Sequence, residues 1–342
     1  MRSVLLLVVA LTACSSDEGE PLSTATTLAC PTPGLLPFRL ESHGFQTDLA
    51  RAIAEESSRN KDEASDTLGN PGGTSASTYL ADDLGPSDVI GYRGVKARST
   101  PTNGLVSTTL PGEYVSLWTY DAGQAEWQQI GRTLTDENGV YELADTGFVA
   151  PNLQPVYAML EADGSCAVHH DYVFATGTKI VVTDIDGTLT DSDAELIDEL
   201  VDEAYVPKMK VAANTLLQTW VDKGYVVVYL TARSHGFRAE TRAWLDGQGF
   251  PLGPIITAND PGAPEAEKSL WLTRLIQDFG WQVVAAYGNA DTDIAAYADV
   301  GIAKDITFII GDLAGTGGTV AIPDNDYTQH IASFVDAQPD AP

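Results

Sequence analysis

The sequence predicts two domains of different class: an α/β domain built on a doubly wound parallel sheet, preceded by a smaller all-β, immunoglobulin-like sandwich. From about residue 177 onward, five short apolar runs alternate with amphipathic helical patterns. That alternation is typical of parallel strands joined by crossover helices. Residues 85–176 instead contain short alternating runs broken by turn residues, which is typical of a sandwich. The chain, at 342 residues, is also longer than one typical core.

The charge of the chain limits its partners. Nineteen Lys and Arg residues stand against 48 Asp and Glu residues, so the net charge is −29. Such an acidic chain is a poor partner for nucleic acid, and simple electrostatics does not attract it to anionic membranes. We expect a monomer with no nucleic-acid partner, and any membrane contact has to arise in another way.

The first fourteen residues predict an export signal. Arg2 precedes the apolar run 4–11, which is too short to span a bilayer. "LTAC" resembles a bacterial lipobox, which implies that Cys14 is lipidated and becomes the first residue of the mature chain. An ordinary signal peptide cut near Ala13 is the alternative. We therefore expect an exported, lipid-anchored bacterial protein, with the outer membrane or periplasm favoured because Ser15 and not Asp follows the cysteine.

Residues 15–84 are expected to form a flexible tether with one short helix. Ser15 to Pro37 is rich in Ser, Thr and Pro. Apolar residues recur every four positions in 45–59, which predicts a helix that packs on the protein, with lipid contact as the less favoured alternative. Residues 57–77 hold almost no apolar side chains, which predicts a loop or disordered link.

Two cysteines remain once Cys14 is set aside. Cys30 and Cys166 form an even pair, and an exported protein folds in an oxidising compartment. A disulfide between them and two unrelated free thiols are left equally open.

The sandwich is expected to use six runs as strands: "DVIGYRGV", "EYVSLWTY", "WQQIGRTL", "GVYEL", "VYAMLEAD" and "AVHHDYVFA". Asn138-Gly139 lies between two of these runs, which predicts a hairpin turn. His169 and His170 are neighbours on a strand and so point to opposite faces. They are expected to be packed or solvated rather than to bind a metal.

Polar residues follow the predicted strands of the α/β domain at the carboxyl ends, where such sheets form their active crevice. Asp184 and Asp186 follow "KIVVT", whereas Thr231 and Arg233 end "YVVVYLTAR". "QVVAAYG" is followed by Asn289, Asp291 and Asp293. Between these motifs, Lys268 lies in line with the buried positions of a helix. Its side chain either extends to water or reaches into the crevice.

These residues are the components of a phosphoryl-transfer site. Asp184 would attack the phosphorus as a nucleophile, and Asp186 would protonate the leaving oxygen and then activate water. Thr231 and Lys268 would hold the phosphoryl oxygens. A hard cation with oxygen ligands must offset the charges that meet, which favours Mg²⁺.

Asp184, Asp186, Asn289 and Asp293 are the expected residues of the metal shell, as ligands or by orienting ligands. Arg233 either grips a substrate headgroup or pairs with Asp246 or another acid. The alternative for the aspartates is that they only cap helices and turns, which several coincidences in the right order make improbable.

Four motifs together resemble those of the haloacid-dehalogenase phosphohydrolases: "DIDGT", "YLTAR", Lys268 and "GNADTD". More narrowly, "DIDGTLTDSD", "GYVVVYLTARSHGFRAETRAWL", "GFPLGPIIT" and "AAYGNADTDIAAYADVGI" are similar to the domain shared by lipins and the large phosphatidylinositol-transfer proteins. The resemblance spans roughly residues 88–311. It includes "WQQIGRTLTDENGVYEL" in the sandwich, which is similar to the segment before that domain in the transfer proteins.

Lipins are Mg²⁺-dependent phosphatidate phosphatases, and their DxDxT motif corresponds to Asp184, Asp186 and Thr188, which adds Thr188 to the expected substrate-binding residues. In the transfer-protein branch the catalytic aspartates are degraded, and the domain is thought to bind phosphatidate without hydrolysing it. This chain keeps both aspartates. Asn289 replaces the Asp of many superfamily members but matches lipins, whereas Asp291 is extra to the lipin pattern and is not expected to be a ligand.

The resemblance and the motifs imply a Mg²⁺-dependent phosphatase that converts phosphatidate to diacylglycerol at a membrane surface. The gap from Asp184 to Thr231 contains one or two helical patterns, and the gap from Arg233 to Lys268 contains a helix and one short strand. Neither gap is expected to hold a separate cap domain, so the crevice should be open to bulky substrates. The alternatives are a non-catalytic phosphatidate-binding module and an exported phosphatase for soluble phosphomonoesters.

Overall fold

The structure is a computed structural model that describes residues 44–56, 61–86, 91–99, 107–121, 123–144, 153, 155–195 and 205–342. The predicted export signal, the lipidation site at Cys14 and the Ser-, Thr- and Pro-rich tether lie outside these residues. Within the described ranges, no helix has both the length and the apolar character that a membrane crossing requires.

The α/β domain is built on a six-stranded sheet in which every neighbouring pair is parallel. The order of the strands is β16-β15-β14-β17-β18-β19. Their bounds are Lys179–Thr183 (β14), Val226–Ser234 (β15), Ile255–Ala258 (β16), Gln282–Gly288 (β17), Thr307–Ile310 (β18) and Val320–Ile322 (β19). The five predicted strands and the doubly wound parallel sheet are thus confirmed, and β19 is an addition too short to show a pattern of its own.

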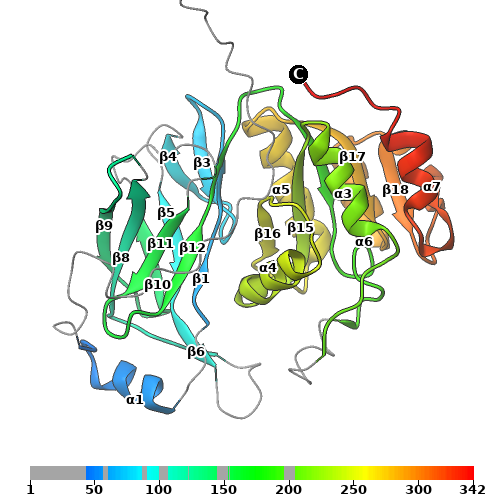
Figure 1. The fold of residues 1–342 in the computed structure, drawn as a ribbon. Helices are drawn as coiled ribbons and strands as arrows, with labels where there is room; N and C mark the ends of the chain where they lie inside the picture. Colours follow the sequence, from blue (N-terminus) through cyan, green and yellow to red (C-terminus); the bar gives the residue numbers. More distant parts are fainter. Residues whose placement is uncertain are drawn as a thin grey trace, which may run out of the picture.

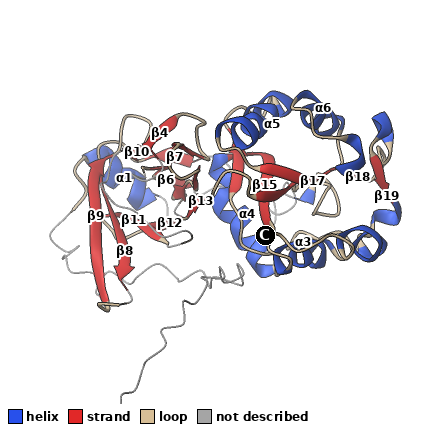
Figure 2. Cartoon of the chain, turned by 90° about the horizontal axis from the view of Figure 1, so that it is seen from above, coloured by secondary structure: helices blue, strands red, loops and turns tan. Residues whose placement is uncertain are grey.

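Helices cover both faces of this sheet (Figures 1 and 2). One face packs against α5 (Pro264–Thr273) and α6 (Asp291–Asp299), and the other packs against α3 (Ala213–Asp222), α4 (Arg238–Gly247) and the C-terminal α7 (Thr328–His330). Successive residues of β14 alternate between the two cores: Ile180 and Val182 lie in one, Val181 in the other. Strands buried on both faces need continuous apolar runs, which explains the sequence of the sheet.

The crevice at the carboxyl edge has no separate cap domain among the described residues. Between β14 and β15 the structure describes α3 as the one helix of more than one turn, and between β15 and β16 it describes α4 after a single 3₁₀ turn at His235–Phe237.

All six predicted runs of the β-domain (residues 61–173) form strands. Their bounds are Tyr92–Val95 (β5), Tyr114–Asp121 (β8), Glu126–Leu134 (β9), Val140–Leu143 (β10), Val156–Leu160 (β11), and Cys166–His169 (β12) with Asp171–Val173 (β13). One apolar core lies between the sheet containing β5 and β10 and the sheet containing β8 and β11. The layered all-β character of this region is confirmed.

The described strands of this region divide among four sheets, however, and the immunoglobulin-like arrangement is not confirmed. The sheets are β1-β5-β10, β12-β11-β8-β9, β13-β2-β3-β4 and the pair β6-β7 (Ala97–Ser99 and Ser107–Thr109). The hairpin predicted at Asn138-Gly139 is also wrong. Gly139 does turn the chain, with a φ of 73°, but β9 pairs with β8 and β10 pairs with β5. The turn carries the chain from one sheet to another.

The loop predicted for 57–77 is wrong where the structure describes it. Residues 61–77 contain β1 (Glu63–Ala64), β2 (Thr67–Gly69) and β3 (Thr74–Ser77), and β4 (Asp83–Pro86) follows. Most of this polar segment is buried, because hydrogen bonds and ion pairs replace the apolar contacts that the prediction required. The β-domain therefore begins near residue 61 rather than at 85.

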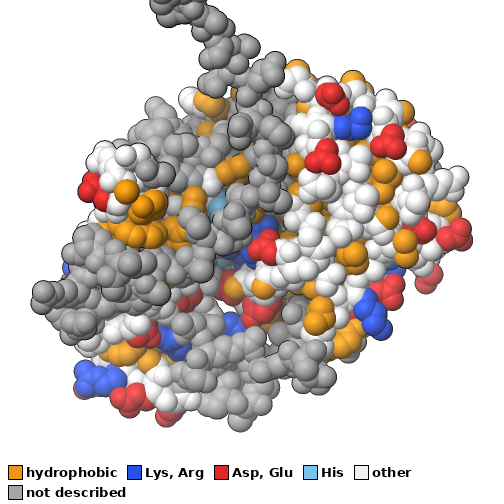
Figure 3. Space-filling model, in the orientation of Figure 1, with side chains coloured by type: hydrophobic (Ala, Val, Ile, Leu, Met, Phe, Trp, Pro, Cys, Tyr) orange, Lys and Arg blue, Asp and Glu red, His pale blue; other side chains and the backbone are white. Residues whose placement is uncertain are grey.

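Asp66 shows how that burial is stabilised at the contact between the two domains. Its carboxylate has no exposed surface, pairs with Arg238 of α4, and accepts the Ile255 N–H at 2.9 Å. Burial alone would raise the pKa of Asp66, but Arg238, His170 and Arg242 lower it below its usual value. Charged side chains of both signs gather between the two domains in Figure 3.

Three smaller predictions fall in the β-domain. Helix α1 (Asp48–Glu56) packs on the β-domain core through Ala50 and Ile53, as expected. His169 is fully buried and contacts the Tyr141 hydroxyl at 2.9 Å, so it is a packed histidine. Cys166 is disulfide-bonded; its partner lies outside the described residues.

Candidate active site

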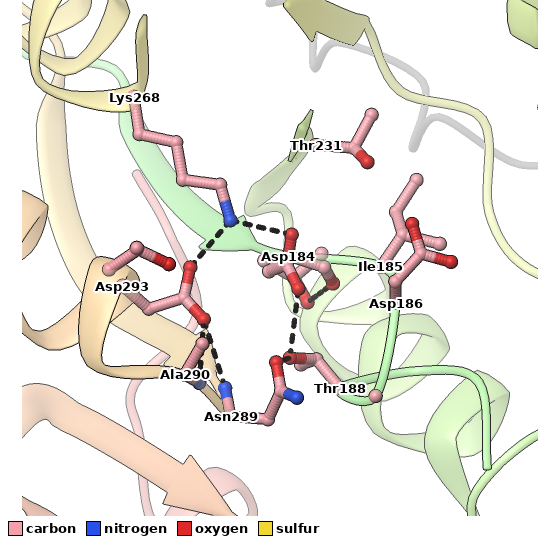
Figure 4. A network of polar contacts seen from close by, with 12 residues as sticks. Asp184, Ile185, Asp186, Thr188, Thr231, Lys268, Asn289, Ala290 and Asp293 are labelled. Carbon is pink, nitrogen blue, oxygen red and sulfur yellow. Dashed lines mark hydrogen bonds and ion pairs between the residues drawn. The ribbon is translucent and has the colours of Figure 1, made fainter. Parts of the chain in front are cut away.

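The carboxyl ends of three neighbouring strands bring the predicted site residues together (Figure 4). Asp184 follows β14, Thr231 lies near the end of β15, and Asn289 follows β17. Asp293 lies in the first turn of α6. The parallel order places these strand ends at one edge of the sheet, so residues more than 100 positions apart share one crevice.

Lys268 is the centre of the polar network. Its Nζ donates to Asp184 Oδ1 at 2.7 Å and to Asp293 Oδ1 at 2.6 Å. The lysine and both carboxylates are almost completely buried, with side-chain exposures of 4%, 7% and 0%. Of the two alternatives for this lysine, the structure shows the one in which it reaches into the crevice.

Burial sets the protonation balance of this cluster. It raises the pKa of Asp184 above its usual value, against the lowering effect of Lys268, and the neighbouring Asp293 and Asp186 add to the rise. Burial alone would lower the pKa of Lys268, but the carboxylates of Asp184 and Asp293 raise it above its usual value. The lysine therefore stays charged and can offset negative charge in the crevice.

Both carboxylate oxygens of Asp293 are already used by the protein. Oδ1 accepts from Lys268, and Oδ2 accepts the main-chain N–H groups of Asn289 and Ala290 at 3.0 and 3.1 Å. These contacts close the turn at the start of α6. They give Asp293 an orienting role for Lys268 and Asn289.

Asp186 points away from Lys268 (Figure 4). Its carboxylate pairs with Arg233. Arg233 Nε and Nη2 donate to its two oxygens at 2.9 and 2.7 Å, and Nη1 donates to Thr241 Oγ1 at 2.9 Å. Only 1% of the Arg233 side-chain surface is exposed. Arg233 thus pairs with Asp186 rather than with Asp246, and its donors face the protein.

Thr188 and Thr231 differ in whether the hydroxyl proton is already used within the protein. Thr188 is fully buried, and its hydroxyl lies 3.2 Å from Asp184 Oδ2 and 3.1 Å from Asn289 Oδ1. Its hydroxyl therefore helps to orient the Asp184 carboxylate. Thr231 Oγ1 accepts the Arg233 N–H at 3.1 Å. Within the described part of the chain no acceptor takes the Thr231 hydroxyl proton, so that proton can serve a bound group.

The donors suited to Mg²⁺ are oxygens of mixed type. Asp184 Oδ2 and Asn289 Oδ1 both lie within hydrogen-bond distance of Thr188, and the main-chain carbonyl of Asp186 accepts no hydrogen bond from the described residues. No group of three or more His, Cys, Asp or Glu side chains is placed to hold a metal in the described ranges. One carboxylate, one carbonyl and one amide fit Mg²⁺, because this ion keeps several waters and takes few protein ligands.

A polar pocket of about 330 Å³ adjoins Asn289 and contains residues that the sequence did not single out. Gly187, Lys210 and Asp193 line it, and Asp193 accepts a hydrogen bond from the Asn289 side chain at 3.0 Å. The signal was present in "DIDGTLTDSD", where Asp193 follows the motif by only a few residues.

Residues 181–311, which contain all of the site, match the family model described as "PITM 1-3, LNS2 domain". The stretch begins within β14 and ends just after β18. The predicted resemblance to the domain of the phosphatidylinositol-transfer proteins is thereby confirmed for the α/β domain.

Several curated proteins are similar over a longer stretch. "Protein retinal degeneration B" of Drosophila melanogaster is 28% identical over 231 residues, covering 66% of this chain and 18% of the fly protein. "Membrane-associated phosphatidylinositol transfer protein 1" of Homo sapiens is 28% identical over 207 residues, 59% of this chain and 16% of the human protein. The matched stretch is thus less than a fifth of either relative.

Among solved structures, a chain of the "Pnkp1/Rnl/Hen1 RNA repair complex" aligns with a TM-score of 0.31 and 18% identity. The alignment covers 40% of this chain and 43% of that chain. This degree of similarity supports no conclusion about function.

Proposed function

We propose that the protein is a Mg²⁺-dependent phosphomonoester hydrolase, with phosphatidate as its leading substrate. The observation that carries the proposal is the buried triad in which Lys268 bridges Asp184 and Asp293 beside Asn289. Two buried carboxylates share this one lysine, so the ionised cluster has one negative charge that Lys268 does not offset. A divalent cation beside Asp184 would offset that charge, and a phosphatase that uses an aspartate nucleophile needs such a cation.

The residues divide the reaction as follows. An oxygen of Asp184, held by Lys268 and Thr188, attacks the phosphorus, and the ester P–O bond breaks as Asp186 gives a proton to the leaving oxygen. Asp186 then takes a proton from water, which attacks the aspartyl-phosphate and restores Asp184. Lys268 and the Thr231 hydroxyl stabilise the phosphoryl oxygens throughout. When bound, Mg²⁺ supplies charge neutralisation between the carboxylate and the phosphate.

The choice of phosphatidate rests on three features. The crevice lacks a separate cap domain in the described residues, which leaves it open to a headgroup at a bilayer. The relatives carry names that refer to membrane association and phosphatidylinositol transfer. The N-terminal sequence resembles a lipobox, and anchoring by a lipidated Cys14 would hold the site at a membrane of an exported protein.

A second candidate is a phosphatidate-binding module without turnover. Asp186, the proposed acid and base, is held by Arg233 with its carboxylate turned from Lys268, and the human relative is named a phosphatidylinositol transfer protein. This candidate predicts liposome binding that depends on phosphatidate and survives Asp186→Asn. Faster hydrolysis of p-nitrophenyl phosphate than of lipid would instead favour a phosphatase for soluble esters.

The test is phosphate release from phosphatidate micelles with and without Mg²⁺. Asp184→Asn should lower the rate by about a thousandfold or more, because the nucleophile is lost. Asp291→Asn is the matched control beside the same site: Asp291 is exposed and accepts the N–H of its neighbour Thr292 at 3.0 Å, and its variant should keep the wild-type rate. If wild type and Asp184→Asn are equally inert on all phosphomonoesters tested, the enzyme proposal is wrong.

A further inference from the structure

Asp193 determines which end of the Asn289 side chain faces the nucleophile. Asn289 Nδ2 donates to Asp193 Oδ1 at 3.0 Å, and Thr188 Oγ1 contacts Asn289 Oδ1 at 3.1 Å. A threonine hydroxyl can donate or accept, so Thr188 alone does not fix the amide. An ionised carboxylate can only accept. The amide nitrogen must therefore face Asp193, which leaves the amide oxygen on the side of Asp184.

The turn after β14 is shaped around this contact. Gly187 has a φ of 71°, and a Cβ at that position would lie 2.1 Å from Asn289 Nδ2 and 2.3 Å from Asp193 Oδ1. The Gly187 N–H donates to Thr190 Oγ1 at 2.9 Å, which holds the turn in place. The backbone thus leaves room for the Asn289–Asp193 hydrogen bond directly above it.

We propose that Asp193 is a positioning residue for the metal site. It holds Asn289 so that the amide oxygen, and not the NH₂ group, faces the divalent cation. The inference rests on the proposed function, because it concerns the metal that the function requires. An asparagine in a metal shell is ambiguous: its oxygen attracts a cation, and its NH₂ group repels one. Asp193 removes the ambiguity because it accepts a hydrogen bond from the NH₂ group. An amide can then be a metal ligand at a position where a carboxylate would otherwise be the ligand.

The proposal predicts that metal affinity depends on an acceptor at position 193. Asp193→Ala removes the acceptor, so the amide can turn its NH₂ toward Asp184, and Mg²⁺ binding should weaken by about 10- to 100-fold, the usual effect of losing a partner of a metal ligand. Asp193→Asn keeps an acceptor oxygen and should lose less. The pair separates hydrogen-bond geometry from long-range charge, because both variants remove the same carboxylate charge.

An exchange of the two residues provides a second, independent test. Asn289→Asp alone puts two carboxylates within about 3 Å of each other, where like charges repel, and should weaken Mg²⁺ binding. Combining Asn289→Asp with Asp193→Asn restores an NH₂ donor facing a carboxylate, with the direction of the hydrogen bond reversed. The double variant should bind Mg²⁺ more tightly than Asn289→Asp alone, an interaction that a double-mutant cycle measures.

The experiment is Mg²⁺ titration calorimetry and Mn²⁺ electron paramagnetic resonance on the full chain, with thermal unfolding of every variant. Weaker binding by Asp193→Ala than by Asp193→Asn, with recovery in the double variant, is the expected result. Equal metal affinity of wild type and Asp193→Ala, or no recovery in the double variant, overturns the inference while the function stands. Absence of metal binding by the wild type overturns the inference and the Mg²⁺ dependence of the proposed function together.

Discussion

Arg233 and Asp186 form the residue pair on which the proposed acid–base chemistry depends. The forked contact holds the Asp186 carboxylate at two points, and Thr241 holds the guanidinium from behind. Arg233→Lys keeps the positive charge but cannot reproduce the planar fork. We expect kcat to fall by about 10- to 100-fold with Mg²⁺ affinity nearly unchanged, since a residue that orients a catalytic group is lost. Steady-state kinetics on phosphatidate and Mg²⁺ calorimetry measure both quantities.

Thr241→Val is the matched control for that substitution. It removes the contact of Nη1 and the hydrogen bond of Thr241 Oγ1 to the Phe237 carbonyl, but it leaves both donors to Asp186 in place, so its effect on kcat should be clearly smaller. Equal kcat for Arg233→Lys and wild type would mean that the function of Asp186 does not depend on its two hydrogen bonds from the Arg233 guanidinium.

The identity of the site residues was predictable, but their pairing was only partly so. The aspartates of "DIDGT", Lys268 and Asn289 follow predictable strand ends or a helical stripe, and the sequence order alone brings them to one edge. Which acid Arg233 pairs with, and that Asp193 reaches Asn289, depends on side-chain rotamers and on the Gly187 turn. Those are set by local packing, for which the sequence pattern contains no periodic signal.

At the scale of elements, strands β5 and β13 are joined by a buried hydrogen bond that makes stability depend on pH. The Tyr92 hydroxyl on β5 donates to Asp171 on β13 at 2.9 Å, and Asp171 has no exposed surface. Burial raises the pKa of Asp171 from its usual 3.8 to about 8, against the lowering effect of Tyr92. The folded protein therefore binds a proton on the Asp171 carboxyl group more tightly than the unfolded chain does.

The sign of the effect follows from that difference. Because the pKa of Asp171 is raised in the folded state, the contribution of this residue to stability is fully present below pH 3.8. It is lost as the pH rises to about 8. Over this range Asp171 should lower the free energy of unfolding by up to about 1.4 kcal/mol per pH unit. Urea unfolding of wild type and Asp171→Asn between pH 5.5 and 8.5 measures it. The free energy of unfolding of the wild type should fall relative to that of Asp171→Asn as the pH rises. A difference between the two that stays constant with pH would contradict the raised pKa of Asp171.

Elements with an apolar period were predictable, and those stabilised by polar contacts were not. The parallel strands and the six runs of the β-domain carry the apolar pattern that burial requires. Strands β1 to β3 are short and polar, and their burial depends on partners such as Arg238 and Ile255 that are more than 170 residues away. No local pattern contains that information, and the same holds for the change of sheet at Gly139.

At the scale of the whole molecule, the two domains share a buried network and should unfold together. Asp66 of the β-domain contacts Arg238, Arg242 and the Ile255 N–H of the α/β domain. Asp66→Ala leaves buried guanidinium groups without their carboxylate, and the free energy of unfolding should fall by about 3–5 kcal/mol. Urea unfolding followed by far-UV circular dichroism and by tryptophan fluorescence should show one coincident transition in the wild type.

Asp48→Asn is the control for this prediction. Asp48 is 98% exposed in its side chain and contacts Arg51 at only 3.8 Å, so its removal should change stability by less than about 0.5 kcal/mol. A similarly small effect of Asp66→Ala would show that the domain contact contributes little to stability. The change of sequence texture near residue 177 predicted two domains, but it gave no sign that their interface is buried and charged.

The covalent phosphoryl intermediate proposed on Asp184 can be trapped with borohydride during turnover. Borohydride reduces an aspartyl-phosphate to homoserine, which peptide mass spectrometry locates to a single position. With phosphatidate and Mg²⁺, we expect homoserine at position 184, none at 186, and none anywhere in Asp184→Asn. Phosphate release without homoserine at 184, or homoserine at another aspartate, would contradict it.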